Sequence, residues 1–171
     1  ASIVETVIHE LTHARYFPRD AVPFNESFAN FVGARGAEQF FRARGDAVNA
    51  DRVAARWADE RRLAEFWRRL YGAIDSAFAS EPGEARRDRR LALRDSLYGV
   101  ARRELVDSVA PLFQAIDPRY AERVRLDNAA LIARRIYLTD LEGFEGAYAQ
   151  AGQDLERAMA AIIRRHAAGR R

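Results

Sequence analysis

The sequence predicts a mainly α-helical protein, and three observations support this class. Apolar residues recur at intervals of three and four along most of the chain, which is the period of an amphipathic helix. Strict alternation of apolar and polar residues, which would predict strands, is almost absent. The five prolines lie at the breaks between the periodic stretches, where they end helices or form turns. We expect a single domain over residues 1–171, because a chain of this length can bury a sizeable core.

Two helices are expected in the first segment, residues 1–45. The first runs from residue 2 to about residue 15, with apolar residues at helical spacing, and Pro18 closes it. A short connection that contains Pro23 follows. The second helix is expected to start at Asn25, a good N-cap residue, and to end near Gly45.

A long antiparallel helix hairpin is expected over residues 50–109. Its two helices, at about 50–79 and 84–109, are separated by the turn-forming pair Pro82–Gly83. The apolar stripes of the two helices predict that they pack on each other, with charged outer faces that include Asp59. The expected inward residues are Val53, Trp57, Leu63, Phe66, Trp67, Leu70, Ile74 and Phe78 on the first helix, and Leu93, Leu97, Val100 and Leu105 on the second.

Shorter helices are expected in the C-terminal segment, residues 110–168. Pro111 and Pro118 interrupt its first part. Periodic stretches then predict helices at about 128–138, 141–151 and 154–166.

Composition excludes several classes of protein. The chain has no cysteine, so it holds neither a disulfide nor a thiolate metal site. No apolar run approaches 18 residues, so no transmembrane segment is expected. The net charge is only +3, and the arginines alternate with carboxylates rather than forming one basic patch. We therefore expect no nucleic-acid partner.

The stretch His9-Glu10-Leu11-Thr12-His13 carries the strongest chemical signal in the chain. His9 and His13 are one helical turn apart, so both imidazoles project from one face and can bind one metal ion. Glu10 lies about 100° further round the helix, beside the metal rather than in line with it. A carboxylate there can accept a proton from a metal-activated water, as in the HExxH zinc peptidases.

A catalytic zinc needs a third protein ligand, and Glu26 is the best candidate. It lies at the expected start of the second helix, after a connection long enough to bring the chain back over the first. Asn30, one turn further on, could hydrogen-bond a ligand. The plain alternative is that Glu26 is an ordinary glutamate near a helix N-terminus. His166 lies near the polar C-terminus and is expected to be solvated.

These residues carry a resemblance to a known family. The segment HELTHARYFPRDAVPFNESFANFVGARG resembles a bacterial family of predicted aminopeptidases among the gluzincin metallopeptidases, which pair an HELAH-type helix with an NEAFATFVE-type segment. The stretch LDNAALIARRIYLTDLEGFEGAYAQAGQDLERAMAAI is similar to the family's C-terminal part. The resemblance implies the helical C-terminal portion of a zincin-like metallopeptidase, a Zn²⁺ cofactor and a peptide substrate. It further implies that His9, His13 and Glu26 are the zinc ligands and that Glu10 is the general base.

The same resemblance leads to further expectations. Family members are longer at the N-terminus and often begin with a lipoprotein-type export signal, which suggests the bacterial cell envelope. We expect an N-terminal segment of the same protein to complete the substrate cleft, so that the chain by itself need not be active. The reaction also needs a donor for the oxyanion. Tyr137 is our candidate, against the alternative of a tyrosine at the edge of the core, and Tyr16 is a weaker one.

A second function class remains open from the sequence. In it the chain is a non-catalytic helical domain that binds structural zinc or a protein partner. Such a site needs no carboxylate at position 10 and would normally fill all four coordination positions of the metal. No fourth ligand is obvious in the sequence, which favours an open, catalytic site.

Overall fold

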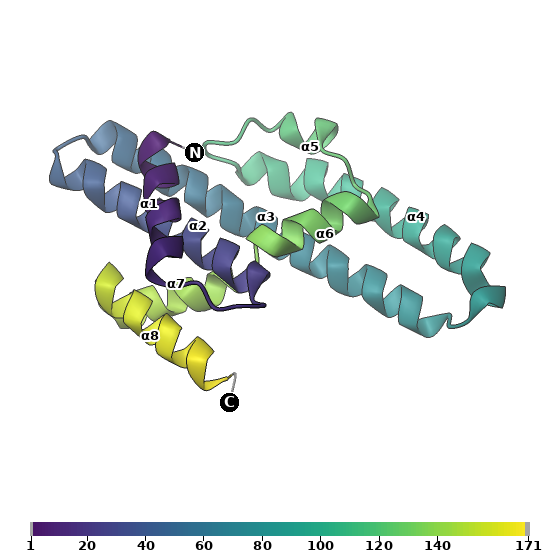
Figure 1. Cartoon of the computed structure of the whole chain (residues 1–171). Helices are drawn as coiled ribbons and strands as arrows, with labels where there is room; N and C mark the ends of the chain where they lie inside the picture. Colours follow the sequence, from purple (N-terminus) through teal and green to yellow (C-terminus); the bar gives the residue numbers. More distant parts are fainter. Residues whose placement is uncertain (1, 170–171) are drawn as a thin grey trace. The chain divides into compact units, whose positions relative to one another are not determined.

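The computed structural model describes residues 2–169, and within that range the secondary structure is helical with no strand (Figure 1). This confirms the predicted mainly α class. The helices are α1 (Ile3–Arg15), α2 (Val22–Ala43), α3 (Ala47–Ser80), α4 (Arg87–Glu104), α5 (Tyr120–Arg123), α6 (Asn128–Tyr137), α7 (Leu141–Gln150) and α8 (Leu155–Ala168). A 3₁₀ turn at Glu84–Arg86 precedes α4, and a π-turn at Leu105–Val109 and a 3₁₀ turn at Ala110–Leu112 follow it.

The chain divides into two compact units, and the long helix α3 supplies residues to both. The first, which we call the terminal unit, comprises Ala1–Trp57 and Ile136–Arg171. The second, the central unit, comprises Ala58–Arg135. Whether the chain folds as one domain stays a prediction.

In the terminal unit, α1 and α2 approach each other closely. A capping box between Ser2 and Glu5 starts α1, and in it the Ser2 hydroxyl accepts from the Glu5 amide at 3.2 Å. A Cβ atom on Gly33 of α2 would lie 3.0 Å from the Glu5 carbonyl oxygen. A Cβ on Gly36 would lie 3.1 Å from the Ile8 side chain. The two glycines therefore allow the backbone of α2 to lie against α1.

The second helix begins earlier than the sequence predicted. It starts at Val22 rather than Asn25, with Pro23 in its first turn, where a missing N–H costs nothing. Asn25 is therefore not the N-cap; it is buried, and its amide nitrogen donates to the Pro18 carbonyl at 3.0 Å. As a result, Glu26 lies in the second helical turn rather than the first.

Aromatic side chains form the core of the terminal unit. Phe28 and Phe31 of α2 are fully buried against Phe144 of α7, with ring centroids 5.8 and 5.7 Å apart. Tyr148 of α7 adds an edge contact to Phe31 at 6.1 Å, and Ile162 of α8 is buried in the same unit. These contacts fix α2 in place, and α2 in turn carries Glu26.

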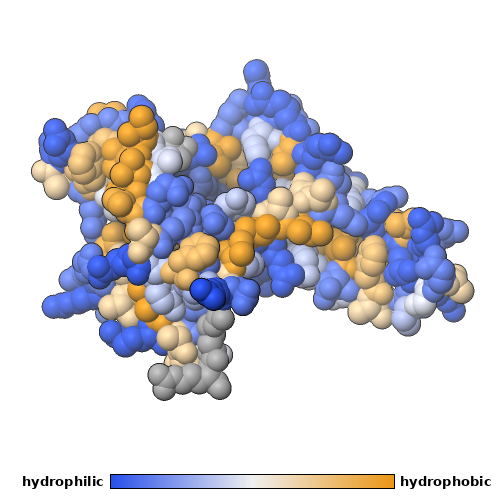
Figure 2. Space-filling model, viewed as in Figure 1, coloured by the Kyte–Doolittle hydropathy of each residue, from blue (hydrophilic) through white to orange (hydrophobic). Residues whose placement is uncertain are grey.

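The other face of α1 is apolar and exposed. Ile3, Val7 and Leu11 lie four residues apart on one side of the helix and are 84%, 53% and 63% exposed. Figure 2 shows this apolar strip along α1. The helical period of these residues was read correctly from the sequence, but within the described residues nothing buries them.

In the central unit, the second part of α3 and α4 form the predicted antiparallel hairpin (Figure 1). Arg69 of α3 pairs with Glu104 of α4, and Arg90 lies 6.0 Å from the ring of Phe78 near the turn. Most of the expected inward residues of α3 are buried. Leu93 and Val100 of α4 are exposed instead, so their predicted inward orientation is wrong.

Asp59 also corrects the sequence reading, because it is fully buried rather than on a solvated face. Its carboxylate accepts backbone N–H groups from Gln114, Ala115 and Ile116 at 2.8–3.0 Å and pairs with Arg62 at 3.0 Å. A buried carboxylate is stable where several donors satisfy it, and this one holds the loop that follows the 3₁₀ turn.

No helix in the described range is long and apolar enough to cross a membrane.

Candidate metal centre

The geometry of α1 brings His9 and His13 together. They are four residues apart on the helix, and their rings meet edge to face with centroids 4.8 Å apart. The two Nε2 atoms are 3.1 Å apart. At this distance one Nε2–H can donate to the lone pair of the other Nε2, and a cation bound by both lone pairs would satisfy the arrangement equally well.

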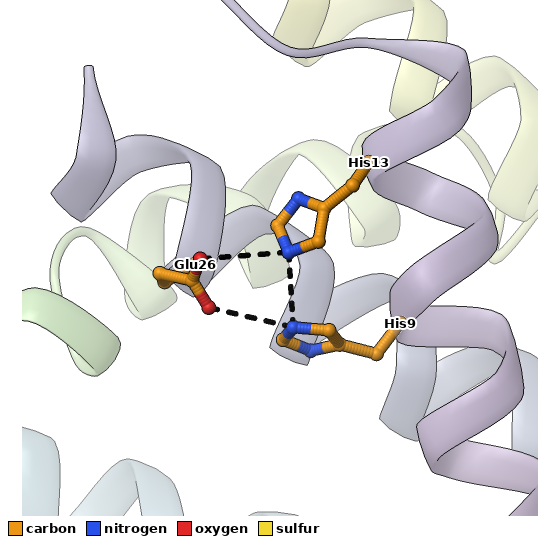
Figure 3. A group of neighbouring side chains, drawn as sticks. All are labelled: His9, His13 and Glu26. Carbon is orange, nitrogen blue, oxygen red and sulfur yellow. Dashed lines mark hydrogen bonds and ion pairs between the residues drawn. The ribbon is translucent and has the colours of Figure 1, made fainter. Parts of the chain in front are cut away.

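Helix α2 adds the Glu26 carboxylate on the same side (Figure 3). Its Oε2 lies 3.4 Å from Nε2 of His9, and its Oε1 lies 3.5 Å from Nε2 of His13. All three side chains are about one-fifth exposed, at 18%, 19% and 21%. The group is therefore sheltered but open to solvent on one side.

These three residues fit a tetrahedral zinc ion. Zinc binds imidazole nitrogen and carboxylate oxygen at about 2.0–2.2 Å, so two ligands of one tetrahedral ion lie about 3.3 Å apart. The 3.1 Å between the two Nε2 atoms is close to that value, and each Nε2 has one Glu26 oxygen at 3.4–3.5 Å, Oε2 for His9 and Oε1 for His13. With one ligand atom from each residue, the three atoms lie within 4.8 Å of one another. Among the described residues, no other group of three or more His, Asp or Glu side chains is placed to hold a metal ion. Two imidazoles and one carboxylate are a ligand set that suits zinc.

Glu10 lies beside this group without joining it. Its side chain is exposed on α1, and within the described part of the chain no hydrogen bond or ion pair holds it. Helical geometry places it between the face of the two histidines and the apolar strip of α1. An exposed carboxylate beside a candidate metal site has the position that a general base requires.

Asn30, one helical turn beyond Glu26 on α2, contacts the backbone of Tyr137. The Asn30 amide donates to the Tyr137 carbonyl oxygen at 3.2 Å. Ser27, which the sequence analysis did not single out, donates to the Ile136 carbonyl at 3.2 Å and accepts from the Thr139 amide at 2.8 Å. The turn of α2 next to Glu26 thus holds the end of α6. The Tyr137 side chain is 47% exposed, and its role as oxyanion donor stays a prediction.

Tyr16 and His166 belong to a separate contact. The Tyr16 hydroxyl lies 3.3 Å from Nδ1 of His166, whose ring stacks on Phe24 at 3.7 Å. His166 is thus half-buried on α8, and the prediction that it is solvated is wrong. It is not part of the metal-binding group. Stacking between residues so distant in sequence could not be read from spacing.

The comparisons with known proteins identify a family for the chain. A family model described as "Putative aminopeptidase" matches residues 1–170. No curated protein and no solved structure matches the chain. The family match covers nearly the whole sequence, including both helices of the metal-binding group. The chain belongs to the "Putative aminopeptidase" family.

Proposed function

We propose that this chain carries the catalytic zinc site of a peptidase, the aminopeptidase activity being suggested by the family name. One observation carries the proposal. His9, His13 and Glu26, from two helices, converge so that one ligand atom from each lies within 4.8 Å of the others, close enough to bind one ion. Three protein ligands leave a fourth position open, which distinguishes a catalytic from a structural zinc site.

Each residue of the site would then have its own role. When bound, zinc would supply the Lewis acid that activates water and polarises the scissile carbonyl. Glu10 would accept the proton of the attacking water and deliver it to the leaving amine. Glu26 and the two histidines would hold the ion. Glu10 is not one of these three residues and would be available for proton transfer.

Tyr137 is the proposed donor to the oxyanion that forms on the substrate carbonyl. Two features support this assignment. Hydrogen bonds from Asn30 and Ser27 fix the backbone around Tyr137 to the helix turn next to Glu26. Its side chain is also half-exposed rather than packed in the core.

Peptide hydrolysis under metal control tests the proposal. The chain would be loaded with zinc and assayed on short peptides with a free amino terminus. We expect hydrolysis that a chelator abolishes and added zinc restores. His13→Ala should lose both metal and hydrolysis. His166→Ala is the matched control, because this histidine lies outside the metal-binding group, and it should keep both.

Two results would contradict the proposal. Hydrolysis that survives removal of the metal would exclude a zinc mechanism. Tight zinc binding without hydrolysis of any peptide, also with the N-terminal segment that the resemblance leads us to expect, would favour the non-catalytic zinc-binding domain instead.

A further inference from the structure

Among the described residues of the terminal unit, two buried polar side-chain atoms have no hydrogen-bond partner. One is Nδ1 of His13 and the other is Oδ1 of Asn25. An unsatisfied buried polar atom costs about 1–3 kcal/mol, so such atoms call for an explanation. Here one atom can donate a proton and the other can only accept one.

The orientation of the Asn25 amide is fixed by its one hydrogen bond. Its nitrogen faces the Pro18 carbonyl oxygen at 3.0 Å, and a carbonyl can only accept. The amide cannot be flipped without placing two acceptors against each other. Oδ1 is therefore the free atom, and with Asn25 only 2% exposed it has no access to bulk solvent.

The protonation of His13 follows from the proposed ligand role. Its Nε2 points at Nε2 of His9 and at the Glu26 carboxylate, so the lone pair that binds a metal is on Nε2. The ring proton of the neutral imidazole is then on Nδ1, which becomes a buried donor in need of an acceptor.

The two atoms belong to one small neighbourhood. Asn25 directly precedes Glu26, whose Oε1 is 3.5 Å from the His13 ring. Asn25 is also bonded to Pro18, and the ring of the preceding residue, Phe17, meets the His13 ring edge to face at 5.4 Å. The His13 ring and the Asn25 amide are thus tied to the same short connection between α1 and α2.

We propose that Asn25 is a positioning residue for the metal centre, through one buried water that accepts the Nδ1–H of His13 and donates to Oδ1 of Asn25. This inference rests on the proposed function, because it requires that His13 binds a metal through Nε2. The hydrogen bond fixes the tautomer and orientation of the ring and makes Nε2 a better ligand. Asn25 would not touch the substrate.

Zinc affinity, measured by competition with a chromophoric chelator, tests this role in three variants of the full chain. Asn25→Ala removes the acceptor, and we expect zinc affinity to fall about 10–100-fold. Asn25→Asp keeps an acceptor for that water but places a carboxylate against the Pro18 carbonyl. It should lower the thermal stability of the metal-free chain while keeping zinc affinity near or above that of the wild type. Asn49→Ala is the control. The Asn49 side chain donates to the Asp46 carboxylate at the start of α3, so this change should leave zinc affinity unchanged.

A second readout does not depend on affinity. In the zinc-loaded wild type, the Nδ1–H proton of His13 should give a slowly exchanging NMR resonance, and Asn25→Ala should make its exchange rapid. Equal losses of affinity in the Ala and Asp variants would mean that Asn25 acts only through Pro18, which would overturn the proposal. Undiminished affinity in Asn25→Ala would overturn it as well, and would leave the zinc site itself standing. A wild-type chain that binds no zinc would overturn both this inference and the proposed function.

Discussion

Glu10 is the single residue on which the catalytic interpretation depends. It is exposed and adjacent to the face of α1 that carries His9 and His13, and within the described residues it forms no hydrogen bond or ion pair. Glu10→Gln keeps the size of the side chain but cannot accept a proton. We expect peptide hydrolysis to fall about 10²–10⁴-fold, with zinc stoichiometry unchanged. Paired measurements of turnover and metal content on the same preparation check this.

The two readouts separate the possible roles of Glu10. Loss of zinc together with activity would show that Glu10 is a ligand or a structural residue. Full activity in Glu10→Gln would show that the base lies elsewhere in the protein.

Helical spacing predicts local neighbours well and tertiary neighbours poorly. The spacing of His9 and His13 was enough to place them on one face, because one turn of helix fixes their relation. That Glu26 would join them followed from motif and resemblance, not from spacing, and the ligand roles stay predictions. Asn25 and His166 were missed because their contacts depend on how α1, α2 and α8 pack.

At the scale of elements, the close packing of α1 on α2 holds His9, His13 and Glu26 together. Gly33 lies where a Cβ would be 3.0 Å from the Glu5 carbonyl oxygen and 3.5 Å from Cβ of His9. The Glu5 carbonyl oxygen belongs to the backbone of α1 and cannot move independently of the helix. Gly33→Ala should therefore push α1 and α2 apart. We expect a loss of about 1–3 kcal/mol in the free energy of unfolding, together with weaker zinc binding.

Gly146→Ala is the matched control for that change. Gly146 lies inside α7 of the same unit, and a Cβ there would meet no atom within 4 Å. The substitution should stabilise the chain by about 0.5–1 kcal/mol, because alanine favours the helix, and should leave zinc binding alone. If Gly33→Ala behaved in the same way, close contact between α1 and α2 would not be needed. Urea unfolding of both variants decides this.

The start of α2 shows that a proline in the sequence does not by itself tell where a helix begins. Pro23 was read as part of the connection, since proline often ends helices. It lies instead in the first turn of α2, where proline is equally suited, and the two cases look alike in a sequence. The apolar stripe of α3 was reliable because it is long, whereas the short stripe of α4 misplaced Leu93 and Val100.

At the scale of the whole molecule, the mainly α class was predictable and the burial of individual charged residues was not. Asp59 reads as one more charge on an arginine-rich helix, because its donors come from a loop more than fifty residues later. Only the folded chain shows that it is a buried acceptor.

Asp59→Ala should therefore destabilise the central unit strongly. It leaves three backbone N–H groups without their acceptor and Arg62 without its partner, and we expect a loss of about 3 kcal/mol in the free energy of unfolding. Asp95→Ala, at an exposed ion pair, should change it by less than about 0.5 kcal/mol. Equal effects of the two substitutions in denaturant unfolding would mean that Asp59 does not anchor the loop.

The central claim is that one chain binds one zinc ion through His9, His13 and Glu26. The most direct test is the metal content of the chain after zinc loading and gel filtration, compared with Glu26→Ala and with Glu142→Ala, an exposed glutamate of the same unit. We predict about one zinc per chain in the wild type and in Glu142→Ala, and loss of zinc in Glu26→Ala. Undiminished zinc in Glu26→Ala, or no zinc in the wild type, would contradict the account.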